Sequence, residues 1–163
     1  MQEHRLEGTY RVYMNSGDLP PQYSKLLARA KKSLSHSYAP YSDFQVGAAV
    51  GLANEAILTG ANQENASYPA GLCAERTALF YAGSKYPGVK ILNMALSAGP
   101  SGKDNKEAVP PCGSCRQAIA EYEQKQNSPI RIYFMGKSGE VKKVDSLLSL
   151  LPLAFNKDFL ENK

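Results

Sequence analysis

Strand-like and helix-like segments alternate along this chain of 163 residues, and that alternation restricts the fold to a sheet packed between helices. A helical pattern of apolar residues begins at Pro20-Pro21 and ends before Pro40. A strand-like run then turns at Asn54-Glu55 into a second strand. In chain order, the predicted elements are a helix after 20, strands over 44–52 and 56–61, a helix from 73 that ends near 83, a strand over 91–98, a helix over 112–126, strands over 130–135 and 141–144, and a helix from 145 to 151.

This order of elements predicts the topology as well as the fold class. The hairpin over 44–61 requires one antiparallel pair, whereas strands joined through a helix should run parallel to their predecessors. We therefore predict an α/β fold, a three-layer α/β/α sandwich with a mixed five-stranded sheet. Residues 20–163 should form this domain. Residues 1–19 should form an N-terminal extension, in which 5–13 is rich in strand-forming residues but is interrupted by Gly8.

Composition and charge exclude several classes of function. Apolar residues make up 43% and charged residues 21% of the chain, as in ordinary globular proteins. The net charge is only +4, and adjacent basic residues occur only at Lys31-Lys32 and Lys142-Lys143, so neither a nucleic-acid groove nor a membrane-binding face is predicted. No apolar run is long enough to cross a bilayer, and the first residues lack the apolar core of a signal peptide. The expected location is therefore the cytosol.

The three cysteines, Cys73, Cys112 and Cys115, carry the strongest chemical signal. An odd number of thiols without a secretion signal argues against a disulfide framework. Cys112 and Cys115 form a C-x-x-C pair at a helix start, which fits a redox dithiol, two zinc ligands or two buried thiols. Cys73 also begins a helix, and two facing helix starts could bring the three sulfurs together. Three thiolates without a fourth protein ligand are typical of a catalytic zinc site, which keeps one position for water.

Two residues beside Cys73 are further candidates. Glu75 lies in the first helical turn, where it could act as a general acid and base, although a glutamate there ordinarily compensates the helix dipole at the surface. Arg76 should donate hydrogen bonds to the ligand sulfurs and offset their charge, and the alternative is a surface salt bridge. The two histidines, His4 and His36, are interpreted as surface residues rather than ligands.

Cys73-Ala-Glu followed by Pro111-Cys-Gly-Ser-Cys resembles the zinc deaminase signature. With cysteine as the first ligand, the chain is similar to the small homotetrameric cytidine deaminases. The resemblance implies one Zn²⁺ per subunit, a homotetramer with sites shared between subunits, and hydrolytic deamination of cytidine and deoxycytidine in pyrimidine salvage. The matching segments are Ala39-Pro-Tyr-Ser-Asp-Phe-Gln-Val-Gly-Ala-Ala49, Thr59-Gly-Ala-Asn-Gln-Glu-Asn-Ala-Ser-Tyr-Pro69, Cys73-Ala-Glu-Arg-Thr77, Pro111-Cys-Gly-Ser-Cys-Arg-Gln117 and Leu150-Leu-Pro-Leu-Ala-Phe155.

The same resemblance implies a set of substrate contacts. By pattern alone, Phe44 is equally a core residue, Phe155 could pack the last helix onto the core, and Asn62 and Glu64 would be turn residues. The implied contacts are the ribose 3′-hydroxyl for Asn62 and Glu64, the pyrimidine for Phe44, the sugar 5′ end across subunits for Ala66 and Tyr68, the base edge for the Ala74 N–H and the Pro110 carbonyl, and a neighbouring subunit's site for Phe155.

These residues together predict a hydrolytic mechanism. Zinc on the three cysteines activates a water for attack on C4 of cytosine, and Glu75 takes its proton, passes it to N3 and protonates the departing amine. Because Glu64 would repel a phosphate, nucleotides are expected to be poor substrates. Two other classes stay open, namely a different zinc deaminase acting on a nucleobase, a nucleotide or tRNA, and a zinc or dithiol module without enzyme activity.

Overall fold

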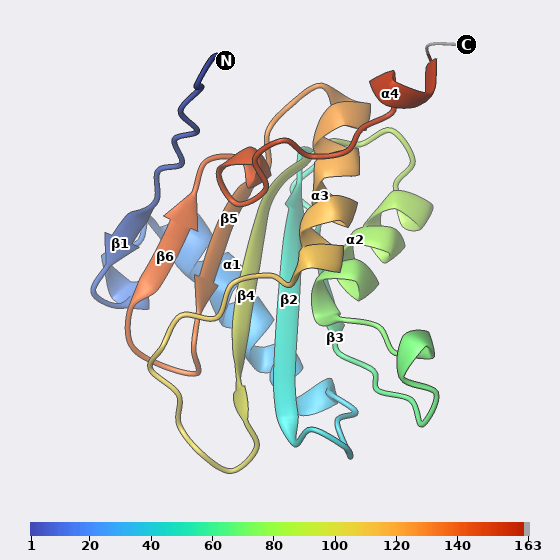
Figure 1. Cartoon of the computed structure of the whole chain (residues 1–163). Helices are drawn as coiled ribbons and strands as arrows, with labels where there is room; N and C mark the ends of the chain where they lie inside the picture. Colours follow the sequence, from blue (N-terminus) through green and yellow to red (C-terminus); the bar gives the residue numbers. More distant parts are fainter. Residues whose placement is uncertain (162–163) are drawn as a thin grey trace.

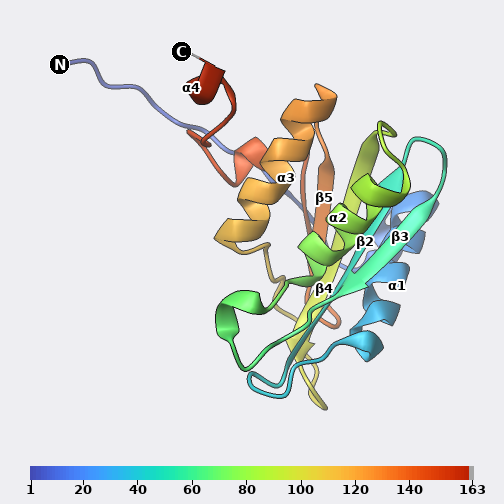
Figure 2. The same cartoon turned by 90° about the vertical axis from the view of Figure 1, so that its right-hand side faces the viewer.

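A six-stranded sheet lies between helix α1 on one face and helices α2 and α3 on the other (Figures 1 and 2), in a computed structural model that describes residues 1–161. The strand order is β1-β6-β5-β4-β2-β3, with β4 and β5 parallel and the other neighbouring pairs antiparallel. This confirms the α/β class and the mixed sheet. The strands are β1 Arg11–Tyr13, β2 Phe44–Leu52, β3 Ile57–Ala61, β4 Ile91–Pro100, β5 Arg131–Met135 and β6 Val141–Val144.

Helix α1, Pro21–Ser33, begins at a proline pair and covers one face of the sheet. Pro21 stands at the first helical position, where its missing N–H costs no intrahelical bond. Leu26, Leu27 and Ala30 form the buried stripe that the 3.6-residue period predicts. Their partners in this core cluster come mainly from the centre of the sheet, and the buried ones are Ala49, Ala95, Tyr133, Met135, Val141 and Leu19.

Helices α2, Ala74–Lys85, and α3, Gly113–Gln126, cover the opposite face and begin close together (Figure 1). Gly60 of β3 permits a close approach of α2, because a Cβ there would lie 2.6 Å from the Ala78 nitrogen and 2.7 Å from the Ala74 carbonyl oxygen. The first turn of α2 is therefore held directly on the sheet. Within residues 1–161, no helix combines the length and the apolar character needed to cross a bilayer.

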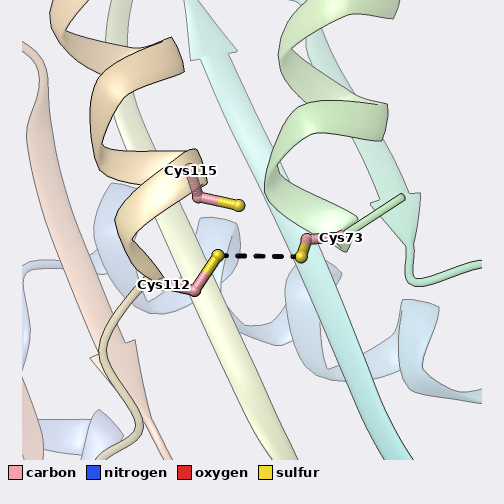
Figure 3. A group of neighbouring side chains, drawn as sticks. All are labelled: Cys73, Cys112 and Cys115. Atoms are coloured by element: carbon pink, nitrogen blue, oxygen red, sulfur yellow. Dashed lines mark hydrogen bonds between the residues drawn. The ribbon is translucent and has the colours of Figure 1, made fainter. Parts of the chain in front are cut away.

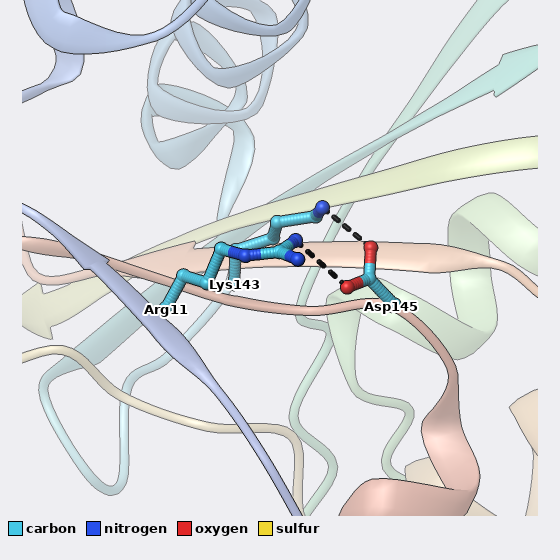
Figure 4. Close-up of polar contacts among 3 residues, drawn as sticks. All are labelled: Arg11, Lys143 and Asp145. Carbon is cyan, nitrogen blue, oxygen red and sulfur yellow. Dashed lines mark hydrogen bonds and ion pairs between the residues drawn. The ribbon is translucent and has the colours of Figure 1, made fainter.

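The prediction of five strands is wrong, because part of the N-terminal extension joins the sheet. β1 pairs antiparallel with β6. Beside this pair, Asp145 forms two ion pairs, from its Oδ2 to Arg11 Nη1 at 2.8 Å and from its Oδ1 to Lys143 Nζ at 2.5 Å (Figure 4). Tyr13 adds an apolar contact to the core beside α1. An unpaired strand edge is a site for further pairing, so the open side of β6 accepts this short strand. Residues 162–163 of the predicted domain lie outside the described residues.

The prediction of a final helix from Asp145 is also wrong. A three-residue 3-10 turn, η4 Leu147–Ser149, replaces it, and Ser146 rather than Asp145 caps that turn. The buried carboxylate of Glu123 accepts hydrogen bonds from the Ser146 hydroxyl at 2.8 Å and from the first N–H of the turn at 2.9 Å. These bonds satisfy the backbone locally without a longer helix. Helix α4, Asp158–Glu161, follows and was not predicted.

Candidate active site

The three cysteines converge where α2 and α3 begin (Figure 3). Cys73 and Cys112 are the N-cap residues of these helices, and Cys115 lies buried in the first turn of α3. The three sulfur atoms lie within 4.8 Å of one another, and those of Cys73 and Cys112 are 3.8 Å apart. Thiolates about 2.3 Å from a tetrahedral zinc are themselves about 3.8 Å apart, so the cluster has the size of a zinc site.

The charges of the cluster favour a bound cation. Contact with the Cys115 thiol, and then with the guanidinium of Arg76, lowers the pKa of the Cys73 thiol. Contact with Cys73 and burial raise the pKa of Cys115. Three neighbouring thiols therefore do not all ionise by themselves, and a divalent cation would supply the missing compensation. Neither His4 nor His36 belongs to this group, which is the one convergent ligand cluster in the described part of the chain.

Arg76 lies against the cluster. Its Nη2 donates to the Sγ of Cys73 at 3.7 Å. No carboxylate within residues 1–161 forms an ion pair with it, so the alternative of a surface salt bridge does not describe its contacts. A cation at this position reduces the negative charge that three thiolates would leave on a bound metal.

Glu75 is the buried carboxylate beside the sulfurs. Only 5% of the residue is exposed, and its Oε2 has no hydrogen-bond partner among the described residues. Burial is the main cause that raises the pKa of Glu75 above its ordinary value. Because an unpartnered buried oxygen is costly, Glu75 fits a site that a further polar group completes. The donor set and this orphaned oxygen together fit a metal centre with a reacting water.

A cavity of about 790 Å³ opens over Cys73, Cys112 and Glu75. This volume lies within the usual range for small-molecule sites. Its polar lining comes from the starts of α2 and α3, the loop after β3 and the loop before β2, and apolar side chains complete the lining. The apolar lining residues are Phe44, Val46, Leu72, Leu96, Ala98 and Val109.

Asn62 lines this cavity, and its side-chain amide makes two hydrogen bonds to the backbone of β2. Its Oδ1 accepts from the Val46 N–H at 2.8 Å, and its Nδ2 donates to the Phe44 carbonyl at 2.9 Å. A primary amide has two N–H groups and two lone pairs. One donor and one acceptor site therefore remain on Asn62.

Glu64 also lines the cavity and is held by the loop before β2. Its Oε2 accepts from the Tyr41 N–H at 2.9 Å and the Ser42 N–H at 3.3 Å, and its Oε1 accepts from the Ser42 hydroxyl at 2.5 Å. The Ser42 hydroxyl is the main cause that lowers the pKa of Glu64 below its ordinary value. Glu64 is therefore an ionised acceptor in the lining of the cavity.

Three of the other expected contacts lie at or beside the cavity. Tyr68, in the 3-10 turn η3 (Tyr68–Ala70), and Pro110 both line it, and the Tyr68 ring lies 5.8 Å from that of Tyr41. Ala74 is fully buried in the first helical position after Cys73.

Ala66 and Phe155 lie outside the cavity of their own chain. Ala66 is exposed on the loop that precedes η3. Phe155 is 57% exposed and stacks on Phe159, with 5.8 Å between the ring centroids. Their positions leave both side chains available to a neighbouring molecule.

Sequence reasoning assigned no role to two residues that shape the site. The Ser42 hydroxyl donates a hydrogen bond to Glu64. The sequence feature that could have indicated Ser42 is its position two residues before a strand, where a serine hydroxyl often binds the backbone that follows. Arg116 donates to the Pro111 carbonyl at 2.9 Å and to the Leu150 carbonyl at 2.8 Å. Arg116 thereby connects the loop before Cys112 to the C-terminal segment. No local sequence pattern predicts this contact, because Arg116 and Leu150 are distant in the chain.

Comparisons with known proteins point to one family. Residues 20–128 match the family described as cytidine and deoxycytidylate deaminase zinc-binding region. A cytidine deaminase of Sporosarcina psychrophila is 39% identical over 137 residues, which cover 83% of this chain and 93% of that protein. One of Halalkalibacterium halodurans is 40% identical over 131 residues, covering 80% and 91%. A crystal structure of cytidine deaminase from Burkholderia pseudomallei superposes with a TM-score of 0.70 at 35% identity, covering 80% of this chain and 97% of that one.

Proposed function

We propose a mechanism for this chain, which belongs to the cytidine and deoxycytidylate deaminase family and hydrolyses cytidine to uridine and ammonia, and we propose that it accepts deoxycytidine as well. One observation carries this function. The buried carboxylate of Glu75, with an unpartnered oxygen, lines the same cavity as Cys73 and Cys112 of the cysteine cluster. A proton carrier beside a metal-binding cluster is what hydrolytic removal of an amino group requires.

The metal of this site is proposed to be zinc, with one ion per subunit held by Cys73, Cys112 and Cys115. The support is the donor set and its dimensions, since thiolates suit zinc and the sulfur spacing suits a tetrahedral ion. When bound, zinc supplies the Lewis acidity that makes water nucleophilic at neutral pH. Arg76 donates to the Cys73 sulfur and so lowers the electron density that the thiolates give to the metal.

Glu75 is proposed to carry the protons of the reaction. Its carboxylate takes a proton from the attacking water and delivers that proton to N3 of the cytosine ring. It then takes the remaining proton of the hydroxyl now on C4 and gives it to the amine, so that C4=O forms as the C4–N bond breaks and ammonia leaves. Burial raises the pKa of this carboxyl. A raised pKa lies closer to the pH of the reaction, so the carboxyl can both accept and release a proton. The low exposure of Glu75 also keeps bulk water away from these transfers.

The sugar is proposed to bind through one hydroxyl shared by Asn62 and Glu64. Asn62 has one N–H left to donate, and Glu64 is an ionised acceptor, so the pair is complementary to a group that both accepts and donates. A hydroxyl does both, whereas an ionised phosphate cannot donate and is repelled by Glu64. Phe44 and the apolar lining would pack against the pyrimidine, and the Pro110 carbonyl and the Ala74 N–H would bind its edge.

A homotetramer with shared sites is also proposed. Phe155 and Ala66 lie outside their own cavity, and the aromatic residues Phe80 and Tyr81 are exposed on α2. Exposed aromatic side chains on a helix favour burial against another copy. Light scattering of the purified protein should give four times the chain mass.

The proposed location is the cytosol, where the three cysteine thiols stay reduced.

An absorbance assay with cytidine, deoxycytidine, cytosine and cytidine monophosphate tests the function, together with elemental analysis for zinc. Turnover of both nucleosides with weak turnover of the base and the nucleotide is the expected result. Preferred turnover of cytosine or of the nucleotide would assign the chain to another deaminase class. Protein that carries and retains no zinc and turns over nothing would support the dithiol module.

A further inference from the structure

The Ser42 hydroxyl lies between the two residues proposed to bind the two halves of the nucleoside. It donates to Oε1 of Glu64 at 2.5 Å and accepts from the Phe44 N–H at 3.1 Å. Glu64 is the proposed sugar acceptor, and Phe44 is the proposed wall for the base. A single hydroxyl therefore links the sugar side of the cavity to the base side.

The hydrogen bonds of Glu64 leave little of its carboxylate free. An ionised carboxylate offers about four lone-pair sites. The Tyr41 and Ser42 N–H groups both bind Oε2, and the Ser42 hydroxyl binds Oε1. Oε1 therefore keeps one acceptor site, and the Ser42 hydroxyl is the one protein group in the described residues that hydrogen-bonds this oxygen.

The loop that carries Ser42 is itself held in place. Asp43 adopts a left-handed backbone conformation with φ of 54°, which a residue other than glycine retains only where its surroundings impose it. Its N–H donates to the Ala39 carbonyl at 3.1 Å, and its carbonyl accepts from the Ser101 N–H at 2.8 Å. Tyr38 joins the loop to the opposite segment, because its carbonyl accepts from the Glu64 N–H at 2.8 Å. The hydroxyl is thus presented from a fixed backbone.

We infer that Ser42 is a positioning residue for sugar recognition, in which its hydroxyl aims the free acceptor site of Glu64 at the 3′-hydroxyl of the nucleoside. Ser42 acts through Glu64 and needs no contact with the substrate. The inference rests on the proposed function, because it requires that Glu64 accept a hydrogen bond from the sugar.

The experiment compares two substrates that differ only in the group concerned. Deoxycytidine has a 3′-hydroxyl, and 2′,3′-dideoxycytidine lacks it. In Ser42→Ala, Glu64 keeps its two bonds on Oε2 and loses the bond that orients Oε1. The KM for deoxycytidine should rise about five- to tenfold, which is less than the loss of a whole hydrogen bond to a charged group because Glu64 keeps its free acceptor site and loses only the bond that orients it; kcat should change less than about twofold. The kcat/KM for dideoxycytidine should change less than about twofold.

Two further variants control this comparison. Ser42→Thr retains a hydroxyl and should restore most of the KM for deoxycytidine. Ser35→Ala removes an exposed serine whose hydroxyl bonds the Lys32 carbonyl outside the cavity, and it should leave both substrates unchanged. Zinc content and melting temperature are measured for every variant, and the kinetics are compared only between proteins whose zinc content and melting temperature match those of the parent.

The outcomes separate this inference from the proposed function. If Ser42→Ala impairs both substrates equally, or leaves deoxycytidine unaffected, the positioning role is wrong while the deaminase assignment stands. If the parent enzyme does not discriminate between the two substrates, the sugar contact of Glu64 is absent, and the positioning role is overturned with it. If the parent turns over neither substrate, the proposed function itself fails.

Discussion

Replacing Glu75 with glutamine tests the catalytic assignment with little change in shape. Glutamine has nearly the same volume but neither accepts nor releases a proton in the reaction. Glu75 is buried and its Oε2 has no hydrogen-bond partner among the described residues, so the change to an amide breaks no protein contact of that oxygen. The three cysteines are untouched, so zinc binding should persist.

The expected loss is large because one carboxylate serves successive proton transfers. A general acid or base contributes about 10²- to 10⁴-fold, which corresponds to about 3–5 kcal/mol of activation free energy. We expect Glu75→Gln to lie near the upper end of this range in kcat. The cytidine absorbance assay measures kcat, and elemental analysis confirms that the variant carries as much zinc as the parent.

Glu123 provides a matched control, because it is the other glutamate among the buried described residues and both of its oxygens have hydrogen-bond partners. They accept from the Ile130 and Leu147 N–H groups at 2.7 and 2.9 Å and from the Ser146 hydroxyl at 2.8 Å. In Glu123→Gln these bonds become neutral, which should cost about 1–2 kcal/mol of stability and leave kcat within about twofold. A Glu75→Gln enzyme that holds full zinc and keeps kcat within about tenfold of the parent would refute our account of proton transfer.

Three other predictions concern the metal, the sugar and the sheet edge. Arg76→Gln should weaken zinc retention against a chelator about 10- to 100-fold, and parental retention would remove its role. Cytidine monophosphate should show a kcat/KM at least about 100-fold below that of cytidine, because Glu64 repels its phosphate; equal values would contradict this. Lys143, and then Arg11, lower the pKa of Asp145, so its ionised form stabilises the fold above the ordinary carboxyl pKa, and this contribution is lost as the pH falls through the lowered value. Asp145→Asn should therefore be less stable than the parent to urea near neutral pH and equally stable in strong acid; a difference that persists in strong acid would contradict the assignment.

The predicted elements that were correct have local causes. The apolar stripe of α1 and the hairpin of β2 and β3 follow from periodicity and turn residues within each segment. The parallel pairing of β4 and β5 follows from the helix between them.

The errors lie where a distant contact outweighs a local pattern. β1 is only three residues long and depends on the open edge of β6 and on Asp145. The predicted final helix is replaced by η4 because Glu123, far away in the sequence, binds the start of that turn. A sequence pattern describes a single segment, whereas each of these contacts joins the segment concerned to a partner in another part of the chain.

By itself, the sequence determined the chemistry: a C-x-x-C pair places two sulfurs on one helical turn, and a Cys-Ala-Glu start places a carboxyl beside a third. Only the tertiary structure brought the sulfur of Cys73 to 3.8 Å from the sulfur of Cys112, a residue 39 positions later in the sequence. It did so by placing two helix starts side by side on the sheet. It also decided that Oε2 of Glu75 is left without a partner while Glu64 is nearly saturated by Ser42 and its neighbours. Hydrogen-bond satisfaction depends on every element that surrounds a group, and that set is defined only when the chain is folded.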